Sequence, residues 1–170
     1  MYAAMPVHTA ASNQQALGLA LNELARNGIT SFQDAGSVQA DLDAYRALHA
    51  AGRLTSRLWL MLAGWDEQLM AGWLKKGPEI DADKDFLTIR AIKLVADGAL
   101  GSRGAWLLEP YSDRPDWSGS ANIPMETVLN VAREALQSGF QLCVHAIGER
   151  ANREVLDQLE IAFEGRRSDA

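Results

Sequence analysis

A lysine and a histidine stand inside two apolar segments whose residue types predict buried β-strands. Lys93 lies in LTIRAIKLVA, residues 87–96, and His145 lies in QLCVHAI, residues 141–147. An unpaired ammonium is strongly hydrated, so burying it is costly or lowers its pKa. Two interpretations of Lys93 remain open. Either the ammonium pairs with a carboxylate such as Asp97 or reaches water along its own stem, or the lysine takes part in chemistry.

Strand periodicity indicates which side chains share a face with these two residues. Residues two apart in a strand point to the same side, so Lys93 shares a face with Val95 and Asp97, and His145 shares a face with Cys143. If the two strands lie in one barrel, Lys93 and His145 can meet in its interior. For His145 alone, a core histidine hydrogen-bonded to a carbonyl is the alternative, and Cys143 is interpreted as packing.

The elements around these strands alternate between helix and strand. Apolar spacing, capping residues and stop signals predict helices at about 12–27, 37–52, 65–77, 124–139 and 150–163. Short apolar runs predict further strands at 29–33 and 57–62. Ser12 with Gln15 is a predicted capping box, and Ser37 is the predicted cap of the second helix. Such alternation predicts an α/β protein with a parallel sheet, because parallel neighbours need helical crossovers.

A long irregular stretch, residues 97–123, follows the Lys93 strand. It interrupts a repeat of about 30 residues, the size of one βαβ unit. Long loops in compact domains are commonly functional, and parallel α/β folds place their sites beyond the carboxyl ends of the strands. We therefore expect a binding or catalytic site at this loop.

Composition restricts the partners. The 170 residues carry a formal net charge of −6, with lysine and arginine scattered rather than clustered, which argues against nucleic acid. No apolar run approaches the roughly 18 residues that a membrane span needs, and the first residues lack the order of a signal peptide. The single cysteine is consistent with a reducing compartment. We expect one domain, a cytoplasmic location and no membrane partner.

Two long motifs resemble the amidohydrolase superfamily, specifically its third amidohydrolase subfamily, which includes N-substituted formamide deformylases. The motifs are IKLVADGALGSRGA followed by EPYSD, and GFQLCVHAIGERANREVL. GITSFQDAG resembles an early strand of the same subfamily and the turn after it. The resemblance runs from about residue 17 to residue 163 in one order.

This resemblance implies a (β/α)8 barrel with one or two divalent metal ions, usually zinc, that activate water to hydrolyse an amide bond. Lys93 stands at the family's fourth-strand lysine, which becomes a carbamate ligand in many members. His145 stands at its fifth-strand histidine ligand. A carbamate would replace a buried cation, which is costly to desolvate, with an anionic oxygen ligand for the metal ions. This exchange would explain a lysine in a buried strand.

The loop after Lys93 resembles the family's DGSLGSR-type stretch and suggests substrate-binding residues. Asp97, Arg103 and Trp106 are the candidates. For Arg103 two interpretations stay open: its guanidinium holds a substrate carbonyl or carboxylate, or it ties the loop down through backbone carbonyls. Asp34 is expected to organise the turn after its strand as a hydrogen-bond acceptor rather than to bind metal.

Several family features are missing. The sequence contains no His-X-His pair, no later histidine ligand and no catalytic aspartate of the family, so no catalytic residue is assigned. We interpret residues 1–170 as a single partial barrel covering strands two to five. Because four strands cannot close a barrel, we expect the isolated chain to be inactive. We also expect its sheet edges to pair with a second copy or with further barrel segments. The alternative function is a non-catalytic α/β scaffold or oligomer-forming fragment.

Overall fold

The computed structural model describes residues 9–80 and 86–164 as alternating helices and strands. The helices are α1 (Ala10–Arg26), α2 (Gln39–Ala50), α3 (Glu67–Lys76), α4 (Met125–Ser138) and α5 (Glu149–Phe163). The strands are β1 (Ser31–Ser37), β2 (Arg57–Ala63), β3 (Glu79–Ile80), β4 (Leu87–Val95) and β5 (Gln141–His145).

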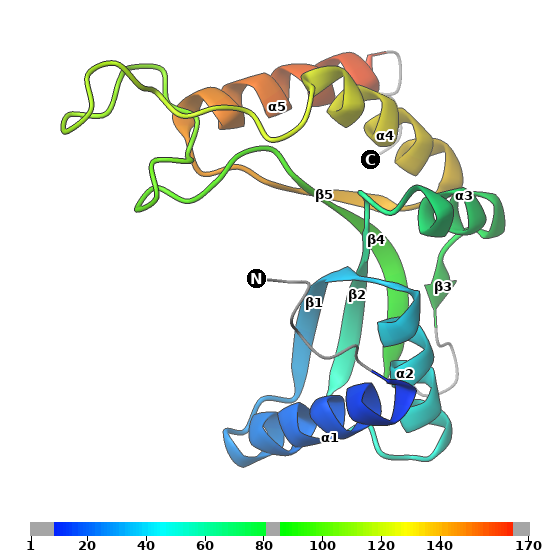
Figure 1. Ribbon diagram of the computed structural model, residues 1–170. Helices are drawn as coiled ribbons and strands as arrows, with labels where there is room; N and C mark the ends of the chain where they lie inside the picture. Colours follow the sequence, from blue (N-terminus) through cyan, green and yellow to red (C-terminus); the bar gives the residue numbers. More distant parts are fainter. Residues whose placement is uncertain (1–8, 81–85, 165–170) are drawn as a thin grey trace.

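Four strands form a parallel sheet in the order β1, β2, β4, β5, as Figure 1 shows. The two-residue strand β3, which the sequence did not predict, pairs antiparallel with the first part of β4. Each parallel neighbour is reached through a helix, as the crossover rule requires. The predicted α/β class, with about four parallel strands and helices on the outer face, is confirmed.

The strands are staggered in the way that an eight-stranded barrel requires. Gln141 at the start of β5 pairs with Ala91, Ala91 pairs with Met61, and Met61 pairs with Ala35. β5 thus begins level with Ala35, which lies four residues after Ser31, where β1 begins (35 − 31 = 4). An eight-stranded α/β barrel has a shear of about 8, or roughly one residue per strand. The sheet therefore has the geometry of half a barrel.

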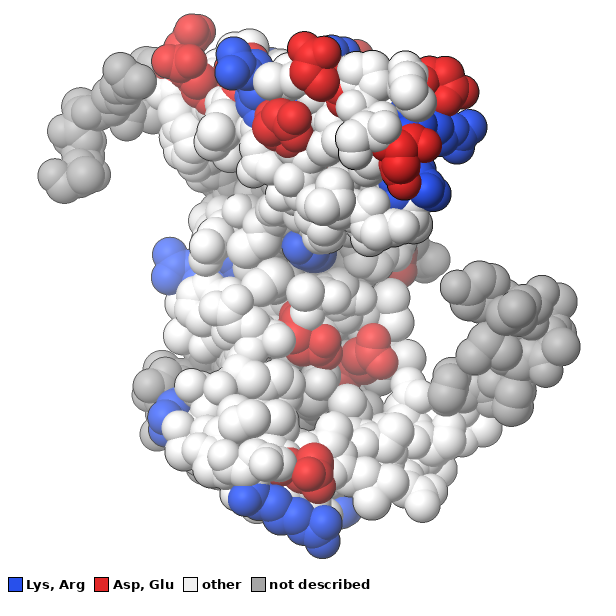
Figure 2. Space-filling view, turned by 90° about the vertical axis from the view of Figure 1, so that its left-hand side faces the viewer, with Lys and Arg blue, Asp and Glu red and all other residues white. Residues whose placement is uncertain are grey.

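The helices cover one face of the curved sheet and leave the other open (Figure 1). On the covered face Leu60, Leu62 and Ile92 are completely buried against the helices. A second apolar cluster forms under α4 and α5 around Leu94 and Val128. Figure 2 views the molecule from the side that α2, α3 and α4 leave open. Charged side chains are most numerous at the upper end of this view, and elsewhere they are fewer and separated by uncharged surface.

The helix starts differ from the predicted ones. The capping box of α1 joins Thr9 to Ser12, so the helix begins earlier than predicted. Ser37 does not cap α2; its hydroxyl donates to Asp34, and the Asp41 carboxylate accepts the backbone N–H of the cap residue Val38. These differences in capping residues leave the order of helices and strands as predicted. No helix in the described ranges is long and apolar enough to cross a membrane.

Candidate functional site

Lys93 and His145 lie on the same face of the sheet, near the carboxyl ends of their strands. In the parallel ladder between β4 and β5, Lys93 pairs with Cys143 and Val95 pairs with His145. Paired residues in parallel strands point to the same side, as do residues two apart in one strand. Lys93 and His145 are therefore diagonal neighbours on the open face. The geometric prediction from strand alternation is confirmed.

The environment of Lys93 excludes the ion pair that the sequence left open. Lys93 is half-buried rather than buried, and among residues 9–80 and 86–164 no hydrogen bond or ion pair reaches its ammonium. Asp97, the suggested partner, is completely buried and occupied elsewhere. Lys93 is thus partly exposed and lies next to His145, whose side chain is 34% exposed.

Cys143, which pairs with Lys93, is not an activated nucleophile. Partial burial raises the pKa of its thiol above the ordinary value, and the nearby positive charge of Lys93 lowers it by less. The thiol is therefore protonated near neutral pH, where only a thiolate would react. The interpretation of Cys143 as packing agrees with this environment.

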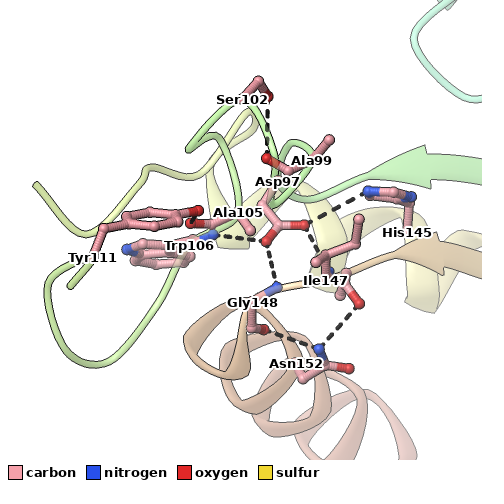
Figure 3. A network of polar contacts seen from close by, with 11 residues as sticks. Asp97, Ala99, Ser102, Ala105, Trp106, Tyr111, His145, Ile147, Gly148 and Asn152 are labelled. Atoms are coloured by element: carbon pink, nitrogen blue, oxygen red, sulfur yellow. Dashed lines mark hydrogen bonds and ion pairs between the residues drawn. The ribbon is translucent and has the colours of Figure 1, made fainter. Parts of the chain in front are cut away.

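Asp97 connects the long loop to the end of β5, as Figure 3 shows. One carboxylate oxygen accepts the backbone N–H groups of Trp106 and Gly148, both at 2.8 Å. The other accepts the N–H of Ile147 at 2.9 Å and lies 3.9 Å from Nε2 of His145. Because Gly148 is the N-cap of α5, the carboxylate also faces the positive end of that helix.

The proposed substrate contact of Asp97 is therefore wrong. Its side chain has no exposed surface, and both oxygens already accept hydrogen bonds from the backbone. Strand alternation had placed Asp97 on the face of Lys93, but β4 ends at Val95 and the alternation ends with it. Asp97 instead fixes the position of the backbone that follows His145.

The backbone of Trp106 also connects the long loop to the start of α5. Its carbonyl oxygen accepts the N–H groups of Arg150 and Ala151, each at 3.2 Å, which satisfies two donors in the first turn of α5. A Cβ atom at Gly148 would lie 1.9 Å from that carbonyl oxygen, so only glycine fits there. The Trp106 indole is partly exposed, and the Arg150 guanidinium lies 5.7 Å from its ring centre. Sequence reasoning named Trp106 for its ring and missed the role of its backbone.

Arg103 ties the loop together, although through a carboxylate rather than through backbone carbonyls. Its guanidinium donates to both carboxylate oxygens of Asp113, at 3.2 and 2.6 Å. The hydrogen bond from Arg103 holds the pKa of the exposed Asp113 carboxyl below its usual range. The Trp117 indole N–H donates to the Arg103 carbonyl at 2.7 Å. With its guanidinium so engaged, Arg103 has a loop-bracing role in this structure.

Asp34 accepts hydrogen bonds as expected. One of its carboxylate oxygens accepts from the Ser37 hydroxyl at 3.2 Å and from the Tyr45 hydroxyl at 3.0 Å. Burial and the adjacent Asp34 charge both raise the pKa of the Tyr45 phenol well above its usual range. The hydroxyl therefore remains a donor that joins β1 to α2.

The described residues do not form a complete metal site. No group of three or more histidine, cysteine, aspartate or glutamate side chains converges in residues 9–80 and 86–164. His145 can offer an imidazole nitrogen, and Lys93 can offer an oxygen only after conversion to a carbamate. A tetrahedral zinc site needs four ligands, of which at least three usually come from protein. Two donors are too few.

A curved half barrel with a long loop beyond β4, and with Lys93 and His145 at its carboxyl rim, is the geometry of a segment of an α/β barrel. The chain belongs to the amidohydrolase family, whose model matches residues 1–169. Solved structures agree: "uncharacterized metal-dependent hydrolase" proteins from Pyrococcus horikoshii OT3 and Pyrococcus furiosus each superpose with a TM-score of 0.83. They are 26% and 28% identical to this chain, which covers 31% and 32% of their lengths; the matches include 91% and 92% of this chain.

Two curated proteins are similar in sequence. YtcJ of Bacillus subtilis (strain 168), named as an amidohydrolase, is 32% identical over 155 residues, which is 86% of this chain and 27% of YtcJ. LONG AFTER FAR-RED 3 of Arabidopsis thaliana is 36% identical over 87 residues, which is 51% of this chain and 14% of that protein. The chain thus spans less than a third of the length of each of these relatives.

Proposed function

We propose that this chain supplies the second to fifth βα units of a metal-dependent amidohydrolase acting on carbon–nitrogen bonds other than peptide bonds. N-substituted formamides are the substrate class that its motifs suggest. One observation supports the proposal most strongly. Lys93 and His145 are diagonal neighbours on the open face near the carboxyl rim, and no ion pair in the described residues occupies the lysine.

The residues have distinct proposed roles. His145 offers a neutral imidazole to a divalent ion, zinc in our proposal, and Lys93 offers carbamate oxygens after reaction with carbon dioxide. In such enzymes the bound metal lowers the pKa of water and so supplies the nucleophile. Asp97 holds the backbone beyond His145, while the loop that Arg103 braces shapes one side of the pocket. The acidic chain is proposed to work without nucleic acid, and its single free cysteine suits the cytoplasm.

The proposal requires that this chain be inactive by itself, because it lacks the remaining metal ligands and the general base. The test is hydrolysis of an N-formyl amine by the purified chain with added zinc, measured by release of the amine. We expect no turnover above that of zinc alone. If the chain turns over substrate and both Lys93→Ala and His145→Gln abolish that turnover, these two residues suffice for catalysis. This result would overturn the proposal that the rest of the site comes from other segments of the barrel.

The sheet edges support a second candidate, a scaffold that assembles with itself or with further barrel segments. Within the described residues, the outer edges of β1 and β5 have no strand partner. The flanking helices also expose large apolar side chains: Leu19 on α1, and Leu156 and Phe163 on α5. Open edges and apolar helix faces favour association. This candidate needs no catalysis, so counting metal ions per chain together with the mass in solution separates the two. A metal-free assembly would favour the scaffold, and stoichiometric metal would favour a working site assembled between chains.

A further inference from the structure

A cavity of about 470 Å³ lies between α2 and α3, on the helix-covered side of the sheet. Its volume is within the range of small-molecule sites, about 300–1,000 Å³. The buried side chains of Leu69 and Trp73 form its floor. Its rim is polar and consists of Gln39, Arg46, Asp66, Gln68 and Lys76. We call it the α2–α3 pocket.

Gly72 lines this pocket from within α3. Glycine is a poor helix former, so it weakens a helix unless its backbone or its neighbours require it. Neither requirement applies to Gly72: its φ is not positive, and nothing outside its own stretch of helix lies within 4 Å of a Cβ atom added there. The missing side chain instead leaves room for a ligand beside the helix.

One end of the pocket is cationic. The Arg46 guanidinium and the Lys76 ammonium lie 5.3 and 4.4 Å from the centre of the Trp73 ring. Both donate to one carboxylate, that of Glu79, and Arg46 also lies 3.7 Å from Asp43. Neither cation uses all of its N–H groups in these contacts, so both keep donors for a further acceptor.

The other end of the pocket is anionic. One Asp66 carboxylate oxygen accepts the Leu69 N–H at 3.0 Å as the cap of α3, and the other accepts no hydrogen bond within the described residues. Asp66 precedes Trp73 by seven residues (73 − 66 = 7), which separates the two ends by roughly 10 Å along the helix. A chain of about three extended residues spans the same length.

We propose that the α2–α3 pocket binds a short peptide of about three residues with free termini. The ammonium of the peptide lies at Asp66, and its carboxylate lies at Arg46 and Lys76. A simple anion would meet the charges of Glu79 and Asp43 beside these cations, and a simple cation would meet the cations themselves. A ligand that carries both charges is therefore favoured.

The two glutamines on the rim supply hydrogen-bonding groups for the peptide backbone. Gln39 donates to Asp43 at 2.8 Å and keeps its carbonyl oxygen as an acceptor, while Gln68 makes no hydrogen bond within the described residues. The pocket lies across the sheet from the side chains of Lys93 and His145. The inference therefore goes beyond the proposed function and does not depend on it.

The test compares two peptides that differ only in their terminal charges, trialanine and N-acetyl-trialanine amide, titrated into the full chain with NMR as the readout. We expect trialanine to shift the backbone signals of Leu69, Gly72 and Trp73. The peptide with blocked termini should bind at least about fivefold more weakly, because it makes no charge-assisted hydrogen bonds at either end.

Two variants remove the site without removing the helix. Asp66→Ser deletes the charge but keeps a residue that caps helices well, and Gly72→Leu fills the pocket with a better helix former. Each should weaken trialanine binding at least about fivefold. Lys76→Gln should also weaken it, whereas Lys75→Gln, the exposed neighbour that does not line the pocket, is the matched control.

Equal binding of the two peptides, shifts confined to other surfaces, or unchanged affinity in both Asp66→Ser and Gly72→Leu would overturn the inference. Absence of trialanine binding to the wild-type chain would overturn it as well. The experiment involves neither metal nor turnover, so its failure would leave the proposed function unchanged.

Discussion

Asp97 holds together backbone from two distant parts of the chain. Its carboxylate accepts N–H groups from Trp106 in the loop and from Ile147 and Gly148 beyond β5. Removing a buried acceptor of this kind would destabilise the fold, because each buried N–H group left without a partner costs about 1–3 kcal/mol. The position of His145 thus depends on a residue that does not itself face the open site.

We predict that Asp97→Asn lowers the free energy of unfolding by at least about 2 kcal/mol, because the amide nitrogen would face a backbone N–H instead of accepting it. Denaturant unfolding of the purified chain measures this. Asp113→Asn is the matched control: its pair with Arg103 is exposed and screened by solvent, so its loss should have a much smaller effect. Equal losses in the two variants would contradict the role assigned to Asp97.

At the scale of elements, the start of α5 and the loop that follows β4 form one unit. The Trp106 carbonyl accepts two N–H groups from the first turn of α5, and Gly148 leaves room for that carbonyl. Without a polar side chain on its N-cap, the helix relies on the loop for these hydrogen bonds. The loop and the end of the His145 strand should therefore order together.

Gly148→Ala should break this unit. The new methyl group would stand 1.9 Å from the Trp106 carbonyl oxygen, so the loop must move away from the helix. We expect a loss of about 2 kcal/mol or more in unfolding free energy, with faster amide exchange at Arg150 and Ala151. Gly101→Ala, where nothing lies within 4 Å of the added carbon, should leave both measurements near wild type. If the two variants behave alike, the steric argument fails.

Glu79 in β3 gives the fold a pH dependence. Partial burial alone would raise the pKa of its carboxyl, but hydrogen bonds from Arg46 and Lys76 outweigh this and hold the pKa below 4.5. Since the folded-state pKa is the lower one, the stabilisation is present above the unfolded-state value and is lost as pH falls through the folded-state value. We expect wild type to exceed Glu79→Gln by up to about 1 kcal/mol at neutral pH. Acid unfolding curves that stay equally far apart below pH 4.5 would contradict this.

At the scale of the whole molecule, the sequence predicted the architecture and part of the candidate site. Period-two alternation placed Lys93 and His145 on one face, because both residues lie inside regular strands. Asp97 lies beyond the end of β4, where its contacts depend on the path of the loop, so alternation could not predict its burial or its backbone partners. The pairing of Arg103 with Asp113 depends on contacts within the long loop, which periodicity does not describe.

The half barrel also predicts self-association. The unpaired edges of β1 and β5 run in the same direction, so β5 of one copy can pair with β1 of another and place the two exposed helix faces together. We expect sedimentation velocity to show species larger than the monomer. Leu156→Lys should shift the distribution toward monomer, whereas Leu108→Lys, in the exposed loop, should not. A wild-type chain that stays monomeric at all accessible concentrations would contradict this prediction.

The central claim is that Lys93 and His145 are donors to one metal-binding position. It is tested most directly by titrating Co²⁺ into the full chain and following paramagnetic broadening of its backbone NMR signals. We predict weak binding that first broadens the signals around Lys93 and His145, with loss of this broadening in His145→Gln and its retention in His49→Gln. Broadening confined to other surfaces, or unchanged by His145→Gln, would contradict the claim.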